Sequence, residues 1–249
     1  MPKDIATNLI NLPWGRGGVT VFGLSLFLAF LAASFVFFRQ ARKEFPSDEE
    51  PISFLVNSLL FWLIGARLVF FLDNFQNFDS PTKLLFLWRY PGLSFSGGFL
   101  AIIVASYFWA KKRRFQIWKL ADQATGPWLI FTSGFFLGQW LSGQEDFYLI
   151  VFGLTLLLIG PVIWALKSYR SLVWYPSGKI GFALLINNAI FFFSFTPLAF
   201  LLSSGLYLEA TLGAVLFFWS LVALFLRSES ESAKMASQRI SKILKTKNG

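Results

Sequence analysis

Apolar residues along this chain fall in seven long blocks that are separated by shorter polar segments. An α-helix needs roughly 20 residues to cross a bilayer, and most of the blocks approach that length. They predict membrane-spanning helices at about 18–38, 52–72, 94–110, 124–141, 147–166, 180–199 and 210–226. The third and fourth blocks are short and rich in small residues, so we expect those two helices to pack inside the bundle.

These blocks predict an all-α, polytopic membrane protein, with a seven-helix transmembrane domain over residues 1–227 and a basic tail over residues 228–249. Composition agrees, since 55% of the residues are hydrophobic and 14% are charged, whereas a soluble domain has about 25% charged residues. Asp4, Asn8 and Asn11 stand where a signal peptide would have its apolar core, so we expect no cleavable signal.

Lysine and arginine are distributed unevenly among the connections, which predicts an orientation. The connections after the first, third and fifth blocks and the tail are basic, as in "KKRR" at Lys111–Arg114, and the others hold few cations or none. Because cytoplasmic loops carry the excess, we expect the N-terminus outside and the C-terminus in the cytoplasm. The net charge of +9 is then a topology signal, and we expect no nucleic-acid partner. The tail suits either a short helix on an anionic leaflet or a solvated end.

The chain contains no cysteine and no histidine. Disulfides, Ser-His-Asp triads and Cys-His pairs are therefore excluded. The usual ligands of zinc, haem and iron–sulfur clusters are missing as well, so we expect no metal and no cofactor. Any chemistry must use arginine, lysine, carboxylates, hydroxyls or amides.

Polar groups inside apolar blocks are the first functional candidates, because burying them in hydrocarbon is costly. Arg67, in "WLIGARLVFFLDNF", lies near the outer end of the second predicted helix, and Asn74 shares its face if the helix continues. An arginine there can present a planar, permanently charged fork to a lipid phosphate. The alternatives are that Arg67 extends to the outer interface or pairs with Asp73.

A second candidate is the start of the third block, where Ser94, Ser96, Gly97 and Gly98 stand close together. The serines can cap the helix that follows, and the N–H groups at its start favour an anion such as phosphate. The glycines allow either a neighbouring helix or a ligand to approach the backbone. Capping with tight packing is the structural alternative to a lipid site.

Two further groups of polar residues stand out. The outer end of the fourth predicted helix holds a cluster that is also typical of surface loops, namely Gln139, Ser142, Gln144, Glu145 and Asp146. In the middle of the sixth, Asn187 and Asn188 are expected to bond to a neighbouring helix. Three of the four candidate groups lie toward the outer leaflet.

The order of these motifs resembles the bacterial prolipoprotein diacylglyceryl transferase family, seven-helix enzymes of the plasma membrane with the N-terminus outside. "GARL" at Gly65–Leu68 resembles the family's glycine–arginine motif late in helix two. "GLSFSGG" at Gly92–Gly98 is similar to its Gly-Leu-Ser-Phe-His-Gly-Gly stretch at every position but one. Asp122 and Pro127 resemble an Asp-x-x-x-x-x-Pro segment that follows.

The chain departs from the family pattern at functional positions. The family histidine falls on Ser96, and the outer segment between the sixth and seventh helices has no arginine. The family signature is Gly-Arg-x-Gly-Asn-Phe-hydrophobic-Asn-x-Glu, and Phe135-Phe136 stands at its leading Gly-Arg. Only Gly138, Trp140 and Leu141 fit the signature, while its glutamate falls on Gln144, beside Glu145. The resemblance therefore implies a divergent member.

The resemblance implies transfer of the diacylglyceryl group of phosphatidylglycerol, or of another anionic phospholipid, to the lipobox cysteine thiol of a prolipoprotein. A cation must hold the departing phosphate, and a base must help the thiol ionise. We expect the catalytic residues to be Arg67, Ser96, Glu145 and Asp146. We expect the lipid-binding residues to be Asn74, Ser94, Gly97, Gly98, Gly138, Gln139 and Gln144.

Two other functions remain open at this point. One is a catalytically inactive lipid-binding or accessory membrane protein on the same scaffold, since the histidine and the signature arginine are absent. The other is a small transporter or channel, although we find no inverted repeat and no paired broken helices of the kind that transporters use.

Overall fold

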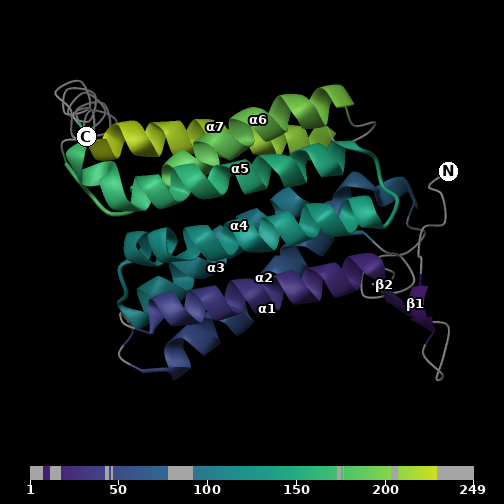
Figure 1. The fold of residues 1–249 in the computed structure, drawn as a ribbon, viewed down its shortest axis with the longest axis horizontal. Helices are drawn as coiled ribbons and strands as arrows, with labels where there is room; N and C mark the ends of the chain where they lie inside the picture. The colour runs from purple at the N-terminus through teal and green to yellow at the C-terminus, as the bar shows by residue number, and fades with distance from the viewer. Residues whose placement is uncertain are drawn as a thin grey trace, which may run out of the picture.

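The computed structural model describes residues 8–11, 18–42, 45, 47–77, 92–172, 175, 177–202 and 207–228. In this part of the chain seven α-helices lie side by side along the long axis of the molecule (Figure 1). They are α1 (Val21–Ala41), α2 (Glu49–Asp73), α3 (Phe95–Arg113), α4 (Ile117–Leu141), α5 (Phe147–Ser168), α6 (Phe182–Leu202) and α7 (Tyr207–Ser228). Short 3₁₀ turns follow α2 and α5, at η1 (Phe75–Asn77) and η3 (Tyr169–Ser171).

Each predicted block forms one helix, so the predominantly helical fold is confirmed. A short antiparallel hairpin, β1 (Asn8–Asn11) and β2 (Gly18–Thr20), was not predicted, because strands of this length show no usable alternation. The hairpin leads directly into α1, where the Thr20 hydroxyl accepts a hydrogen bond from the Gly23 N–H at 3.0 Å. The predicted tail helix lies in residues 229–249, outside the described residues.

The start of α4 is the boundary that the apolar pattern misplaces, since the helix begins at Ile117 rather than at about residue 124. The Asp122 carboxylate accepts hydrogen bonds from the Gly181 N–H at 2.6 Å and the Leu184 N–H at 3.3 Å, at the N-terminus of α6. The Arg227 guanidinium of α7 lies 4.1 Å from the Trp118 ring centre. Contacts with α6 and α7, rather than hydrophobicity, therefore hold these first turns.

Five of the described helices are long and apolar enough to cross a membrane: α1, α2, α5 together with η3, α6 and α7. The helices α3 and α4 are long enough, with 19 and 25 residues, but their composition is less apolar than that of the other five. The protein is therefore a membrane protein with several apolar helices.

The most extensive helix–helix contacts are between α1 and α4, between α2 and α3, and between α6 and α7. In Figure 1, α5, α6 and α7 form one half of the molecule and α1 to α4 the other. Small residues allow the close approach of α1 and α4, where a Cβ atom added at Gly134 would lie 2.1 Å from the Ala29 Cβ. The Ser25 hydroxyl also donates to the Gly134 carbonyl at 2.8 Å.

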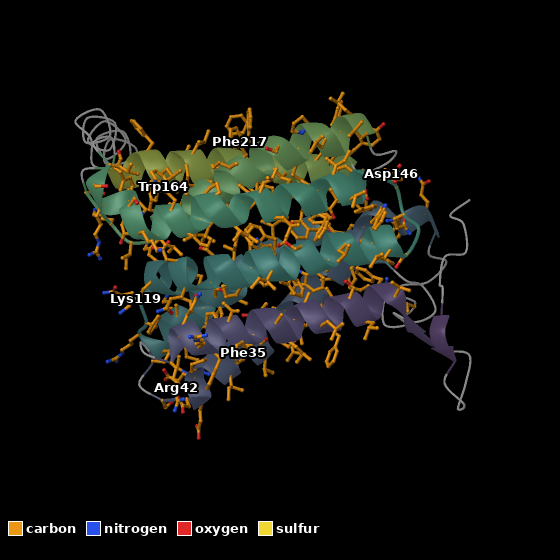
Figure 2. All side chains as sticks on the ribbon, in the orientation of Figure 1. Phe35, Arg42, Lys119, Asp146, Trp164 and Phe217 are labelled. Atoms are coloured by element: carbon orange, nitrogen blue, oxygen red, sulfur yellow. The ribbon has the colours of Figure 1, made fainter. Side chains whose placement is uncertain are left out.

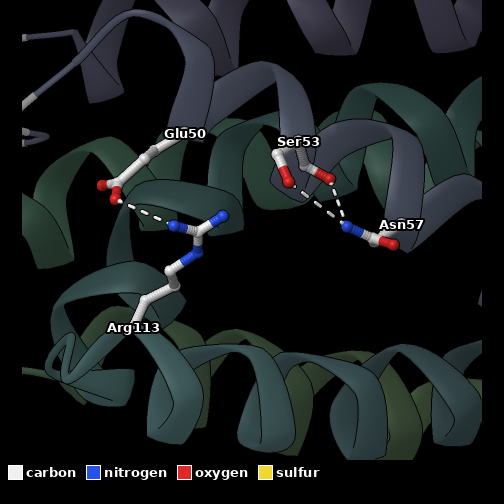
Figure 3. A network of polar contacts seen from close by, with 4 residues as sticks. All are labelled: Glu50, Ser53, Asn57 and Arg113. Carbon is white, nitrogen blue, oxygen red and sulfur yellow. Dashed lines mark hydrogen bonds and ion pairs between the residues drawn. The ribbon is translucent and has the colours of Figure 1, made fainter.

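The two ends of the bundle differ in charge. Arg42 and Lys119 lie at one end, and Asp146 lies at the other, in the turn between α4 and α5 (Figure 2). At the basic end Arg113 of α3 forms an ion pair with Glu50 of α2 at 3.9 Å, and the Asn57 amide donates to the Ser53 carbonyl at 2.7 Å (Figure 3). Partly exposed pairs of this kind contribute little to stability.

Candidate functional site

The segment Gly92–Gly98 forms the start of α3 and is held against α2. Ser94 is the N-cap residue, and its hydroxyl accepts a hydrogen bond from the Gly97 N–H at 3.0 Å. The Ser94 N–H donates to the Ala66 carbonyl of α2 at 2.9 Å. Gly92 has a φ of +147° and lies against the Phe70 ring, where an added Cβ atom would come within 2.1 Å. The predicted capping by Ser94 is confirmed.

Gly97 and Gly98 are both in direct contact with α2. A Cβ atom added at Gly97 would lie 2.5 Å from the Val69 Cβ and 2.7 Å from the Gly65 carbonyl oxygen. At Gly98 it would lie 2.4 Å from the Trp62 Nε1. Of the two roles that the sequence left open for these glycines, the close approach of another helix is the one that the packing requires.

Arg67 lies inside the protein, beside the same segment. Arg67 is 3% exposed, and its Nη1 donates a hydrogen bond to the Gly92 carbonyl at 3.0 Å. The guanidinium carbon lies 5.7 Å from the centre of the Phe70 ring. This burial is incompatible with extension of the side chain to the interface, and no ion pair with Asp73 forms among the described contacts.

Asn74 does not continue the Arg67 face, because α2 ends at Asp73 and Asn74 is its C-cap. Its side-chain amide donates to the Phe70 carbonyl at 3.0 Å, and its own backbone N–H donates to the same carbonyl at 3.0 Å. The amide of Asn74 therefore helps to close the end of α2.

A buried carboxylate that the sequence reading overlooked contacts Ser96. The Ser96 N–H donates to Oε2 of Glu209, in the first turn of α7, at 2.9 Å. The Ser96 hydroxyl is 3.5 Å from the Glu209 carbonyl oxygen. Ser96 is fully buried and Glu209 is 6% exposed. Glu209 lies one residue before the predicted start of its helix, outside the apolar block, where a carboxylate is typical of a surface connection.

A cavity of about 30 Å³ lies at Glu209. Its other lining residues are mostly aromatic: Leu93, Phe95, Phe135, Phe136, Gln139, Phe147, Tyr148 and Phe195. The Phe95 ring packs on Phe136 at 4.8 Å and on Phe135 at 5.5 Å between ring centres. Phe135 and Phe136 therefore fill the space beside the start of α3.

The other predicted residues at this end lie elsewhere. Gln139 lines the cavity at Glu209, whereas Gln144, Glu145 and Asp146 are exposed in the turn between α4 and α5 and do not line it. Gly138 packs against α1, where an added Cβ atom would lie 2.9 Å from the Ser25 Cβ.

Asn187 and Asn188 do not form the expected interhelical bonds. Each is 1% exposed, and their amide atoms have no hydrogen-bond partner in the part of the chain that the structure describes. The prediction that these amides bond to a neighbouring helix is therefore wrong. Their position inside the bundle is as expected.

A much larger apolar cavity, of about 600 Å³, extends between α1, α2, α3 and α4 and reaches α6 and α7. Trp62 and Phe99 line one part of it, and Phe54 and Leu120 another. Trp62 is also the residue in contact with Gly98, so the cavity begins directly beside the start of α3. Its volume and apolar lining are those of a site for a small organic ligand.

The geometry joins the two motifs that resemble a known family, since Arg67 of "GARL" binds the carbonyl of Gly92 in "GLSFSGG". The model of the prolipoprotein diacylglyceryl transferase family matches residues 9–236. The chain belongs to this family. A phosphatidylglycerol–prolipoprotein diacylglyceryl transferase of Idiomarina loihiensis is 30% identical over 116 residues, which are 44% of this chain and 42% of that relative.

Similar matches occur in other bacteria. The correspondingly named protein of a Janthinobacterium species is 29% identical over 45% of this chain and 43% of its own length. That of Geobacter sulfurreducens is 31% identical over 41% of this chain and 40% of its own length. Each of these matches spans less than half of the curated relative. Family membership therefore rests on the family model, which matches residues 9–236, and the similarity to individual relatives covers less than half of the chain.

Proposed function

We propose that this member of the prolipoprotein diacylglyceryl transferase family transfers the diacylglyceryl group of phosphatidylglycerol to a lipobox cysteine of prolipoproteins. The observation that carries the proposal is the position of Arg67. Its guanidinium is buried against the start of α3, and the apolar cavity begins beside that same segment. A fixed cation next to an apolar cavity matches the two parts of a phospholipid, the phosphate and the acyl chains.

In this reaction the cysteine thiol loses its proton and its sulfur attacks the diacylglyceryl carbon that carries the phosphate oxygen. The carbon–sulfur bond forms as the carbon–oxygen bond breaks, and glycerol phosphate leaves with the electron pair. Arg67 holds the phosphate and stabilises the negative charge that it gains.

The large cavity accommodates an acyl chain. Along α2 its lining extends from Trp62 to Phe54, eight residues and therefore about 12 Å. Trp62 is five residues from Arg67, about 7.5 Å along the helix axis. A lipid whose phosphate meets Arg67 can thus place apolar chain beside Trp62 and onward toward Phe54.

We also propose the topology that the sequence predicted: seven spans in a bacterial plasma membrane, the N-terminus outside and the C-terminus in the cytoplasm. The helices α3 and α4 have 19 and 25 residues, enough for about 28 and 38 Å. In α3 the cations of the last turn, Lys111–Arg113, lower the hydrophobicity. In α4 buried polar residues such as Thr125, Thr132 and Ser133 contribute to it. The collection of cations at one end of the bundle supports this orientation.

The test uses purified protein in phosphatidylglycerol liposomes with a lipobox peptide, and mass spectrometry measures the diacylglyceryl-peptide. We expect Arg67→Ala to lower the rate of transfer by about 100- to 1,000-fold, the usual effect of removing a group that stabilises transition-state charge. Arg113→Ala is the matched control, because that arginine lies at the opposite end of the bundle, and it should transfer at the wild-type rate. Equal rates for wild type and Arg67→Ala would contradict the proposed role.

One observation favours a second candidate, a lipid-binding protein without catalysis. Phe135 and Phe136 occupy the positions of the signature Gly-Arg and fill the core beside the start of α3. Phosphatidylglycerol that co-purifies with the protein, combined with no diacylglyceryl-peptide in the liposome assay, would establish this candidate instead.

A further inference from the structure

The proposed reaction needs a base, and the carboxylates predicted for that task are badly placed. Glu145 and Asp146 are exposed in the turn between α4 and α5, and neither lines the cavity at Glu209. The chain has no histidine to replace them. A base must lie within hydrogen-bond reach of the proton that it removes.

Glu209 has the required position. Its carboxylate binds the backbone N–H of Ser96 at 2.9 Å, and Ser96 is the position on which the family histidine falls. Arg67 binds the Gly92 carbonyl, four residues earlier in the same segment. The proposed phosphate-binding cation and this carboxylate therefore hold the two ends of one segment, Gly92–Ser96, which can be at most roughly 14 Å long.

The carboxylate of Glu209 retains capacity to accept a proton. A carboxylate offers about four acceptor sites, and the described contacts use one of them, on Oε2. The ion pairs among the described residues are Arg42–Asp48 and Arg113–Glu50, so no described cation pairs with Glu209. A buried carboxylate without a paired cation is suited to proton transfer.

The cavity at Glu209 suits a thiol. Its volume of about 30 Å³ admits one group of the size of a water molecule. Aromatic rings form most of its wall, and sulfur makes favourable contacts with ring edges. Gln139 and Tyr148 are the other polar residues of the lining.

We propose, on the basis of the transferase function above, that Glu209 is the general base for the lipobox thiol. Its carboxylate takes the proton from sulfur as sulfur attacks the diacylglyceryl carbon. The carbon–oxygen bond breaks toward the phosphate, and the proton then passes from Glu209 to the departing glycerol phosphate. No oxidant, metal or further reactant is needed.

The competing explanation is that Glu209 only caps α3, and the chain offers a matched control for it. The Asp122 carboxylate binds the Gly181 and Leu184 N–H groups at the start of α6 in the same manner, at the opposite end of the bundle. Glu209→Gln keeps an oxygen for its one capping hydrogen bond, whereas Asp122→Asn keeps an oxygen for one of its two, and both variants remove the charge. A purely structural role therefore predicts an effect of Glu209→Gln that is no larger than that of Asp122→Asn.

The experiment measures single-turnover transfer from phosphatidylglycerol liposomes to a lipobox peptide for wild type, Glu209→Gln and Asp122→Asn over a range of pH. We expect Glu209→Gln to lower the rate at neutral pH by at least about 100-fold, with the wild-type melting temperature and phosphatidylglycerol binding. Its rate should recover at alkaline pH, where the peptide thiol ionises by itself. Asp122→Asn should transfer at close to the wild-type rate.

Each other outcome is decisive. Wild-type transfer by Glu209→Gln would overturn the base role and leave the transferase function standing. A lost rate that alkaline pH does not restore would show that Glu209 acts through structure. No transfer by the wild-type protein would overturn the proposed function and the base role together.

Discussion

At position 97 even one additional carbon collides with α2. The nearest atoms include the Val69 Cβ at 2.5 Å and the Gly65 carbonyl oxygen at 2.7 Å, and a backbone atom cannot rotate away as a side chain can. A larger residue here must therefore separate α2 from α3. Because Arg67 binds the segment that precedes α3, such a shift also moves the proposed phosphate site.

We accordingly expect Gly97→Ala to lower the free energy of unfolding by about 1–3 kcal/mol, the usual cost of overpacking. Gly153→Ala in α5 is the control, since nothing lies within 4 Å of a Cβ atom added there. Alanine is the better helix former by about 1 kcal/mol, so this control should be neutral or stabilising. Thermal unfolding in detergent measures both, and a Gly97→Ala protein as stable as wild type would show that α2 and α3 can separate freely.

At the scale of elements, the start of α3 depends on one hydroxyl. Ser94→Ala removes the cap that accepts the Gly97 N–H, which should cost about 1 kcal/mol. We expect transfer to fall as well, because the cap fixes the segment Gly92–Ser96, which Arg67 and Glu209 both bind. Thr20→Ala removes the corresponding cap of α1 and should lower stability without lowering transfer. Equal transfer rates for Ser94→Ala and Thr20→Ala would show that the start of α3 has no specific role in the reaction.

The sequence predicted the helices well because each apolar block is long and continuous, and the structure places α5 and α6 within three residues of the expected bounds. It missed the first turns of α4, since Lys119, Asp122 and Gln123 interrupt the apolar pattern there. Those turns are fixed by contacts with α6 and α7, which local hydrophobicity does not report.

The site was predicted less completely. Arg67 and Ser94 were found because a charge within a span and a serine before a helix each have a local physical meaning. Glu209 was missed because it is distant in sequence from Ser96, and only the packing of α7 beside α3 brings the two together. Whether a glycine faces a helix or a ligand is likewise decided by its neighbours in space, as Gly98 and Trp62 show.

At the scale of the whole molecule, the topology can be tested because the chain has no native cysteine. Single cysteines at Lys112 and Gln144, both exposed, report on the turns at the two ends of α4. With seven spans and an outside N-terminus, a membrane-impermeant maleimide applied to intact spheroplasts should label Gln144→Cys and spare Lys112→Cys until the membrane is permeabilised. Labelling of both in intact spheroplasts would mean that α3 and α4 do not cross the membrane.

The central claim is that this protein moves a diacylglyceryl group to a thiol, and one measurement tests it most directly. A lipobox peptide is incubated with the wild-type protein in phosphatidylglycerol liposomes and, separately, in phosphatidylethanolamine liposomes, and its mass is measured together with the glycerol phosphate released. In phosphatidylglycerol liposomes we expect the mass of a diacylglyceryl group on the cysteine and an equal amount of released glycerol phosphate. In phosphatidylethanolamine liposomes we expect neither product. An unmodified peptide in both liposomes, with phosphatidylglycerol bound to the protein, would contradict the claim.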